Sequence, residues 1–228
     1  MISVRTKLYF SMENLILQQF FVFTFSERHD KMCSYLYFSF LRGQTMDSNF
    51  FALISRMRYI ARWGLMRNTF EENIQEHSHM VAVLAHALGV IRRDIFHQPC
   101  DVNALATAAL YHDASEILTG DLPTPIKYHN AEIMSAYHAV EDLAVQKLLG
   151  MLPPELRETY ADVLAEDKDG DIYPLVKAAD KLSAYIKCIE ERKAGNNEFL
   201  SAEAQTRAAL EASPLPEVQY FLEHFIPA

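Results

Sequence analysis

The sequence predicts an all-α fold with a single helical domain. From about residue 46 onward, apolar side chains recur every three or four residues, the spacing of a helix face that packs on a core. Glycine is scarce, with 7 in the chain, and no run alternates apolar with polar residues as a half-buried strand would. A chain of 228 residues, 50% of them hydrophobic, is long enough to bury one sizeable core.

The overall charge disfavours two classes of partner. A formal net charge of -9 argues against nucleic acid or an anionic membrane surface as the main ligand. It does not exclude an anionic small molecule, because a few arginines and a metal ion can hold one locally. The 3 cysteines show no CxxC spacing, so we expect a reducing, cytoplasmic setting.

Residues 1–45 differ from the rest of the chain. We expect them to be an accessory or mis-annotated extension, disordered or loosely attached, ahead of a catalytic domain at residues 46–228. Their apolar run at residues 20–25 is far shorter than the roughly 20 residues that span a bilayer. Met46 is a candidate for the natural start, and a membrane-associated helix is the alternative for the extension.

The domain is expected to begin with two helices. The first covers residues 49–63 and ends at Gly64, and the second follows residues 76–78 and runs to about residue 97. His77 lies one turn before the apolar stripe of the second helix, on the same face, so it points inward. That stripe consists of Val81, Leu84, Ala85, Leu88 and Ile91.

A third helix, capped by Asp101 or Asn103, is expected to carry His112, Asp113 and Glu116. His112 and Glu116 continue the buried stripe that Leu105 and Ala109 begin. A histidine and a glutamate on an inward face are costly unless something pairs them, and a bound metal ion is one such partner.

The second half of the domain is expected to be helical as well. We expect a helix that ends near Gly150, a shorter one opened by the prolines at 153–154, and a third over residues 174–193. Residues 195–197 end that helix, and two further helical stretches complete the chain. Asp180 lies beside the apolar stripe of the helix at 174–193.

Four inward-leaning side chains from three helices are candidate metal ligands, namely His77, His112, Asp113 and Asp180. Two imidazoles and two carboxylates suit a borderline divalent cation rather than Ca²⁺, and four protein ligands leave open positions for water and substrate. From the residues alone, simpler explanations remain open. They are a core histidine held by hydrogen bonds, an ion pair between Asp180 and Lys181, and a partly exposed helix end at Glu116.

Five short stretches carry a more specific signal. They read RWGLMRN at 62–68, EHS at 76–78, YHDASE at 111–116, TGDLPTPIKY at 119–128 and AGNNEF at 194–199. With the spacing of the four candidate ligands, they resemble the bacterial 5′-deoxynucleotidases of the HD-domain metal-dependent phosphohydrolases, an all-α superfamily. The resemblance covers residues 46–227. Gly64 departs from it, because the family is expected to have proline there, but no functional side chain is lost.

The resemblance implies hydrolysis of a deoxyribonucleoside 5′-monophosphate to the deoxyribonucleoside and phosphate by a metal-activated water. It implies one divalent ion, Co²⁺ or Mn²⁺ first, with Cu²⁺, Fe²⁺, Ni²⁺ or Zn²⁺ as further options, held by the four candidate ligands. It also implies a homodimer with a small-molecule substrate, and neither nucleic acid nor a membrane as partner.

The same resemblance assigns roles to individual residues. Glu116 transfers a proton, Arg62 binds the phosphate and offsets charge in the transition state, and Trp63 forms a wall for the sugar or base. The resemblance also makes Asp113 a catalytic residue, together with Glu116 and Arg62. It implies that Asp113 and Asp180 contact the substrate as well. The loop that holds the sugar consists of Asp121, Leu122, Pro123 and Thr124.

Three alternatives to this function remain. The first is an HD phosphohydrolase for another nucleotide, such as a triphosphate, a cyclic nucleotide or a hyperphosphorylated guanosine nucleotide. The second is a non-catalytic nucleotide sensor with the same fold. The third, a purely structural helical domain, leaves the inward histidines and aspartates unexplained.

Overall fold

The structure is a computed structural model that describes residues 49–127, 129–165 and 170–226. Within these ranges it is helical, and the only β interaction is an isolated antiparallel bridge between Ala61 and Asn73. The all-α prediction is therefore confirmed. The predictions for residues 1–45 lie outside the described residues.

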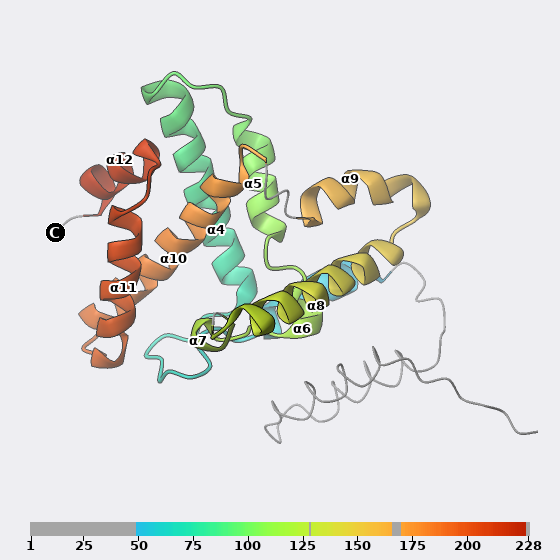
Figure 1. The fold of residues 1–228 in the computed structure, drawn as a ribbon, viewed down its shortest axis with the longest axis horizontal. Helices are drawn as coiled ribbons and strands as arrows, with labels where there is room; N and C mark the ends of the chain where they lie inside the picture. The colour runs from blue at the N-terminus through green and yellow to red at the C-terminus, as the bar shows by residue number, and fades with distance from the viewer. Residues whose placement is uncertain (1–48, 128, 166–169, 227–228) are drawn as a thin grey trace, which may run out of the picture. The chain divides into compact units, whose positions relative to one another are not determined.

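The described helices, with a long helix-free connection at residues 60–73, follow one another along the chain (Figure 1). They are α3 (Phe50–Ile54), the 3₁₀ helix η1 (Ser55–Tyr59), α4 (Ile74–Val90), the π-helical η2 (Ile91–Ile95), α5 (Val102–Tyr111), α6 (Glu116–Thr119), α7 (Thr124–Lys127), α8 (Ala131–Gly150), α9 (Pro154–Leu164), α10 (Tyr173–Lys193), the 3₁₀ helix η3 (Asn197–Phe199), α11 (Leu200–Glu211) and α12 (Pro216–Phe225).

Helices α4, α5 and α10 form the centre of the core (Figure 1). Leu88, Leu105 and Leu182, one from each helix, are fully buried in the same cluster. Gly89 lets α4 and α5 approach closely, because a Cβ there would lie 3.0 Å from a methyl carbon of Leu105. These three helices also carry or adjoin the candidate ligands, so the packing of the core sets the geometry of the site.

The first helix is shorter than predicted. It ends at Ile54, continues as the 3₁₀ helix η1 to Tyr59, and turns extended at Ile60. The reason is a tertiary pairing, since Arg62 N donates to Glu72 O at 2.9 Å and Ile74 N donates to Ile60 O at 3.0 Å. These bonds draw the chain out of the helix, so Arg62 lies on an extended segment.

The helix predicted to carry His112 through Glu116 also ends earlier, at Tyr111. After it, Ala114 N bonds to Tyr111 O and Glu116 N bonds to Asp113 O, which are tighter three-residue turns. Asp101 caps α5, as predicted, by accepting from Asn103 N and Ala104 N. The turn presents Asp113 beside His112, and α6 begins at Glu116.

The second helix begins earlier than predicted, at Ile74, because Asn73 and Glu76 form a reciprocal capping box. Its inward stripe is buried as predicted, and His79 and His86 are exposed. The cap fixes the first turn of α4, where His77 lies.

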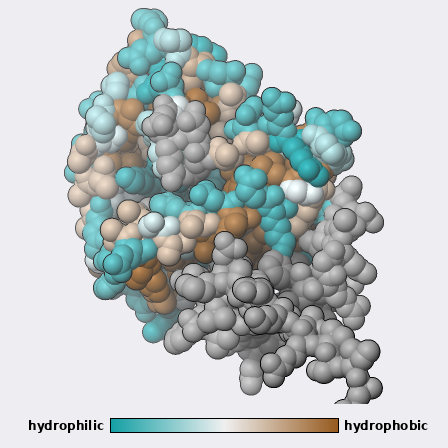
Figure 2. Space-filling view, turned by 45° about the vertical axis from the view of Figure 1, so that its right-hand side comes forward, coloured by the Kyte–Doolittle hydropathy of each residue, from teal (hydrophilic) through white to brown (hydrophobic). Residues whose placement is uncertain are grey.

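The surface of the domain mixes polar and apolar side chains. On the face drawn in Figure 2, hydrophilic areas are interspersed with smaller hydrophobic ones. In the described part of the chain, no helix combines the length and apolar character needed to cross a membrane.

Candidate metal and substrate site

Three predicted ligands converge at the centre of the fold. One ligand atom each from His77, His112 and Asp180 lies within 4.8 Å of the others. His77 comes from the first turn of α4, His112 from the end of α5, and Asp180 from the second turn of α10. Residues far apart in sequence thus meet where the three core helices approach one another.

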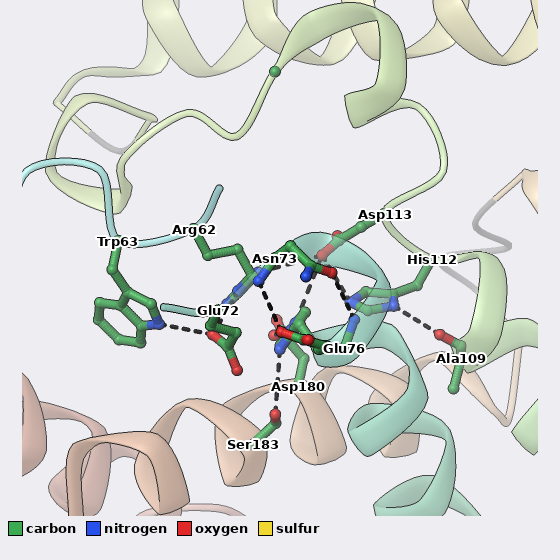
Figure 3. Close-up of polar contacts among 12 residues, drawn as sticks. Arg62, Trp63, Glu72, Asn73, Glu76, Ala109, His112, Asp113, Asp180 and Ser183 are labelled. Carbon is green, nitrogen blue, oxygen red and sulfur yellow. Dashed lines mark hydrogen bonds and ion pairs between the residues drawn. The ribbon is translucent and has the colours of Figure 1, made fainter. Parts of the chain in front are cut away.

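Hydrogen bonds on the far side of each ring orient the two imidazoles. His112 Nδ1 lies 2.8 Å from Ala109 O (Figure 3), and since a carbonyl only accepts, Nδ1 carries the proton. His77 Nδ1 lies 3.2 Å from Ser183 Oγ on α10. Both Nε2 atoms are buried and make no hydrogen bond with the described residues. The lone pair of His112 Nε2 therefore faces the cluster, and His77 Nε2 presents one as well in the tautomer whose Nδ1 donates to Ser183 Oγ. Two such nitrogens fit a bound metal ion.

The carboxylate of Asp113 completes the predicted set. Its Oδ2 lies 3.2 Å from His112 Nε2 and 3.6 Å from His77 Nε2, while Asp180 Oδ1 lies 3.0 Å from His77 Nε2. Burial alone would raise the pKa of Asp113, but the nearby His112, His77 and Arg62 hold it well below its usual value. Burial would raise the pKa of Asp180 as well, but the nearby His77 and His112 together lower it overall. Both carboxylates are thus anionic near neutral pH, as candidate metal ligands need to be.

Arg62 lies beside this cluster on the segment that follows η1, and Trp63 comes next with a left-handed φ of 59°. Arg62 Nη1 lies 3.4 Å from Asp113 Oδ2, and Arg62 Nε donates to Glu72 Oε2 at 3.1 Å (Figure 3). Burial would lower the pKa of Arg62, but the charges of Asp113, Asp180 and Glu72 raise it overall. The guanidinium therefore stays positive next to the candidate metal site, where a phosphate would need a cation.

Glu116 is the predicted acid–base group. Its side chain is buried, and Oε2 has no hydrogen-bond partner among the described residues. Burial, followed by the charges of Asp113 and Asp121, raises the pKa of Glu116 well above its usual value. A carboxyl group in this state can hold a proton near neutral pH and release it to a leaving oxygen.

The predicted sugar loop follows α6. Gly120 adopts the left-handed φ of 77° that ends α6, and Tyr137 of α8 donates to Gly120 O at 3.4 Å. Asp121 is half-buried, and burial raises its pKa, although the charge of Arg62 acts against this. Leu122 and Pro123 are also half-buried, whereas Thr124 is exposed at the start of α7. Asp121 is thus the loop residue that interacts electrostatically with the cluster.

A second network ties the segment around Arg67 to the end of α10. The fully buried Glu191 accepts hydrogen bonds from Thr69 N at 2.9 Å, Phe70 N at 3.1 Å and Asn196 Nδ2 at 2.8 Å. Lys187 Nζ lies 2.5 Å from Glu191 Oε1 and also donates to Phe70 O. The RWGLMRN and AGNNEF stretches also meet directly, since Asn196 Nδ2 donates to Arg67 O at 2.7 Å and Arg67 N donates to Glu198 Oε2 at 2.9 Å.

Sequence reasoning missed several of these supporting residues. Ser183 follows Asp180 by one helical turn and could have been found from that spacing. Glu72 and Tyr137 gave no such signal, because their partners are distant in sequence. Glu191 lies four residues after Lys187, but its backbone partners at Thr69 and Phe70 are distant in sequence.

Comparisons with known proteins agree with this arrangement. A family model described as 5′-deoxynucleotidase YfbR-like matches residues 49–228. The 5′-deoxynucleotidases YfbR of Shigella boydii and of Escherichia coli K12 are each 50% identical to the chain over 183 residues, which is 80% of this chain and 92% of theirs.

Solved structures show the same fold. An HD-domain phosphohydrolase from Listeria innocua has a TM-score of 0.71 and 26% identity, over 78% of this chain and 87% of its own. A cyanophage S-2L HD phosphohydrolase, described as bound to dA and one catalytic Zn²⁺ ion, has a TM-score of 0.50 and 26% identity, over 75% of this chain and 91% of its own.

Proposed function

The chain belongs to the YfbR-like 5′-deoxynucleotidase family, and from this premise we propose how its site carries out the reaction. The protein is a phosphoric monoester hydrolase that converts deoxyribonucleoside 5′-monophosphates to deoxyribonucleosides and phosphate. The observation that carries the proposal is the convergence of two unbonded imidazole nitrogens and Asp180 beside the cationic Arg62.

His77, His112, Asp113 and Asp180 would hold one divalent metal ion. When bound there, such an ion lowers the pKa of a water ligand and polarises a phosphoryl oxygen. The two buried imidazoles favour a borderline cation, and Co²⁺ or Mn²⁺ is our first choice, with Cu²⁺, Fe²⁺, Ni²⁺ and Zn²⁺ as further options. The cyanophage neighbour is described as bound to one catalytic Zn²⁺ ion, which supports a divalent metal ion in this chain.

Arg62 binds the phosphate through the terminal nitrogens of its guanidinium, since its Nε is engaged by Glu72. Glu116, whose side chain is buried, holds a proton and delivers it to the leaving 5′-oxygen. Trp63 forms an apolar wall for the sugar or base. Asp121 accepts from the 3′-hydroxyl, with Leu122, Pro123 and Thr124 completing the sugar loop.

The activity itself can be tested with a panel of nucleotides and metals. The purified protein is expected to release phosphate from dAMP or dTMP with added Co²⁺ or Mn²⁺, more slowly from AMP, and not after EDTA treatment. Colorimetric phosphate release measures this. Equal rates on ribo- and deoxyribonucleotides would contradict the deoxyribose preference, and full activity after complete metal removal would contradict the metal requirement.

Glu116→Gln is expected to keep the metal but lower kcat by about 10²- to 10⁴-fold, the usual contribution of a general acid or base. The amide is nearly isosteric but cannot deliver a proton. Steady-state kinetics and metal content by mass spectrometry measure the two effects separately. Glu158→Gln, at an exposed position of α9, is the matched control. Full activity in the Glu116 variant would remove its acid–base role.

We also propose that residues 46–228 form the whole catalytic domain, with residues 1–45 as an accessory extension. The family match over residues 49–228 supports this division. A homodimer in the cytoplasm is the assembly and location that we propose.

A further inference from the structure

We propose that Glu72 is a positioning residue whose carboxylate holds Arg62 and Trp63 in the orientation that the substrate meets. The inference rests on the proposed roles of Arg62 and Trp63, and assigns to Glu72 the task of fixing both. Among the described residues, no hydrogen bond or ion pair joins the Glu72 side chain to a candidate metal ligand, and its partners are Arg62 and Trp63.

One oxygen atom joins the two substrate-facing side chains. Glu72 Oε2 accepts from Arg62 Nε at 3.1 Å and from Trp63 Nε1 at 2.9 Å (Figure 3). The side chains of Arg62 and Glu72 are only 14% and 16% exposed, so water competes weakly for these bonds. A carboxylate oxygen accepts two donors readily, and both bonds are strengthened by its charge.

The shared oxygen determines which edge of the guanidinium is available. Arg62 is held at Nε by Glu72 and at Nη1 by Asp113, so its plane is fixed between two carboxylates. Without Glu72, the carboxylates of Asp113 and Asp180 would be the main anionic groups attracting the Arg62 guanidinium. The guanidinium would then turn away from the pose that offers its terminal nitrogens to a phosphate.

Trp63 needs this support for a separate reason. It has a φ of 59°, in the left-handed region that a bulky residue rarely adopts. Its ring packs against Phe199 with centroids 5.2 Å apart, and its indole N–H is held by Glu72. The packing against Phe199 and the hydrogen bond to Glu72 together fix the orientation of the indole ring.

The backbone places Glu72 opposite Arg62 independently of the Glu72 side chain. Arg62 N donates to Glu72 O at 2.9 Å, and Ala61 pairs with Asn73. A change of the side chain alone therefore leaves the backbone pairing in place, so a positioning role can be separated from a purely structural one.

The test compares Glu72→Ala with Glu72→Gln, using Trp63 as the probe. Trp63 is the single tryptophan of the chain, so its fluorescence reports on this site alone. We expect Glu72→Ala to lower kcat/KM about tenfold or more through the loss of two charge-assisted bonds, with weaker inhibition by inorganic phosphate. We also expect lower anisotropy and greater acrylamide quenching of Trp63. Glu72→Gln keeps an acceptor oxygen, so its kcat/KM, phosphate inhibition and Trp63 fluorescence should lie between those of Glu72→Ala and the wild type.

Glu71→Gln, at the exposed neighbouring position, is the control and should match the wild type in every measurement. Wild-type fluorescence together with wild-type kinetics in Glu72→Ala would overturn the inference. So would lower activity with unchanged fluorescence and unchanged phosphate inhibition. Arg62→Ala and Trp63→Phe test the underlying function separately. Suppose that both variants keep full kcat/KM while Glu72→Ala still lowers the anisotropy of Trp63 and increases its quenching. The proposed substrate roles of Arg62 and Trp63 would then be wrong, and the positioning of Trp63 by Glu72 would stand.

Discussion

Asp113→Ala is expected to abolish metal binding and phosphate release together. The Oδ2 atom of Asp113 lies near both imidazole nitrogens and near Arg62, so one truncation removes a candidate metal ligand and the partner of the proposed phosphate-binding cation. We expect kcat/KM to fall by about 10³-fold or more, at least the scale seen when a directly stabilising group is lost. Metal content by mass spectrometry and phosphate release measure the two effects.

Asp142→Ala, at an exposed position of α8, is the matched control for Asp113→Ala. Thermal unfolding of both variants shows whether the domain remains folded. If Asp113→Ala retained a full equivalent of tightly bound metal, Asp113 would not be a ligand. Its effect on rate would then act through Arg62 alone.

Glu191→Ala is expected to cost about 3–5 kcal/mol of unfolding free energy, as when one partner of a buried ion pair is removed. The change leaves the buried Lys187 ammonium without its carboxylate and two backbone N–H groups, at Thr69 and Phe70, without acceptors. For a domain of this size the melting temperature should fall by about 10 °C. Calorimetry measures it, and Glu190→Ala, at an exposed position on the same helix, is the control. A shift no larger than that of the control would contradict the role of Glu191.

The same network predicts a dependence of stability on pH. Burial would raise the pKa of Glu191, but the bonds from Lys187, Thr69 and Asn196 hold it below its usual range in the folded protein. A carboxyl group with a lowered folded pKa stabilises the protein above its unfolded pKa of about 4.3, and this contribution is lost as the pH falls further. Glu191→Gln should therefore weaken the pH dependence of stability in that acidic window.

The sequence was most informative where local spacing determines structure. The stripe after His77 predicted a buried helix face, and Asp101 caps α5 as its position before the apolar run suggested. The convergence of His77, His112 and Asp180 was predicted from inward-facing positions together with the family resemblance.

The errors arose where distant backbone atoms compete with the helix. Helical periodicity continued past Ile54, but Ser55–Tyr59 form a 3₁₀ helix, and the pairing of Arg62 with Glu72 draws the chain after Tyr59 out of the helix. In the same way, the spacing of His112 and Glu116 suited a continuous helix, but the chain forms tighter turns between them. No local pattern indicates which residues lie opposite each other across such a connection.

Helix α10 carries Asp180 near one end and Glu191 near the other, about 16 Å apart at 1.5 Å per residue. One rigid element therefore supports a candidate metal ligand and also anchors the segment that leads back to Arg62. The segment from Arg62 to Phe70 is therefore ordered when the protein folds, and its conformational entropy is not lost again when the nucleotide binds. The binding energy of the substrate thus remains available for lowering the reaction barrier.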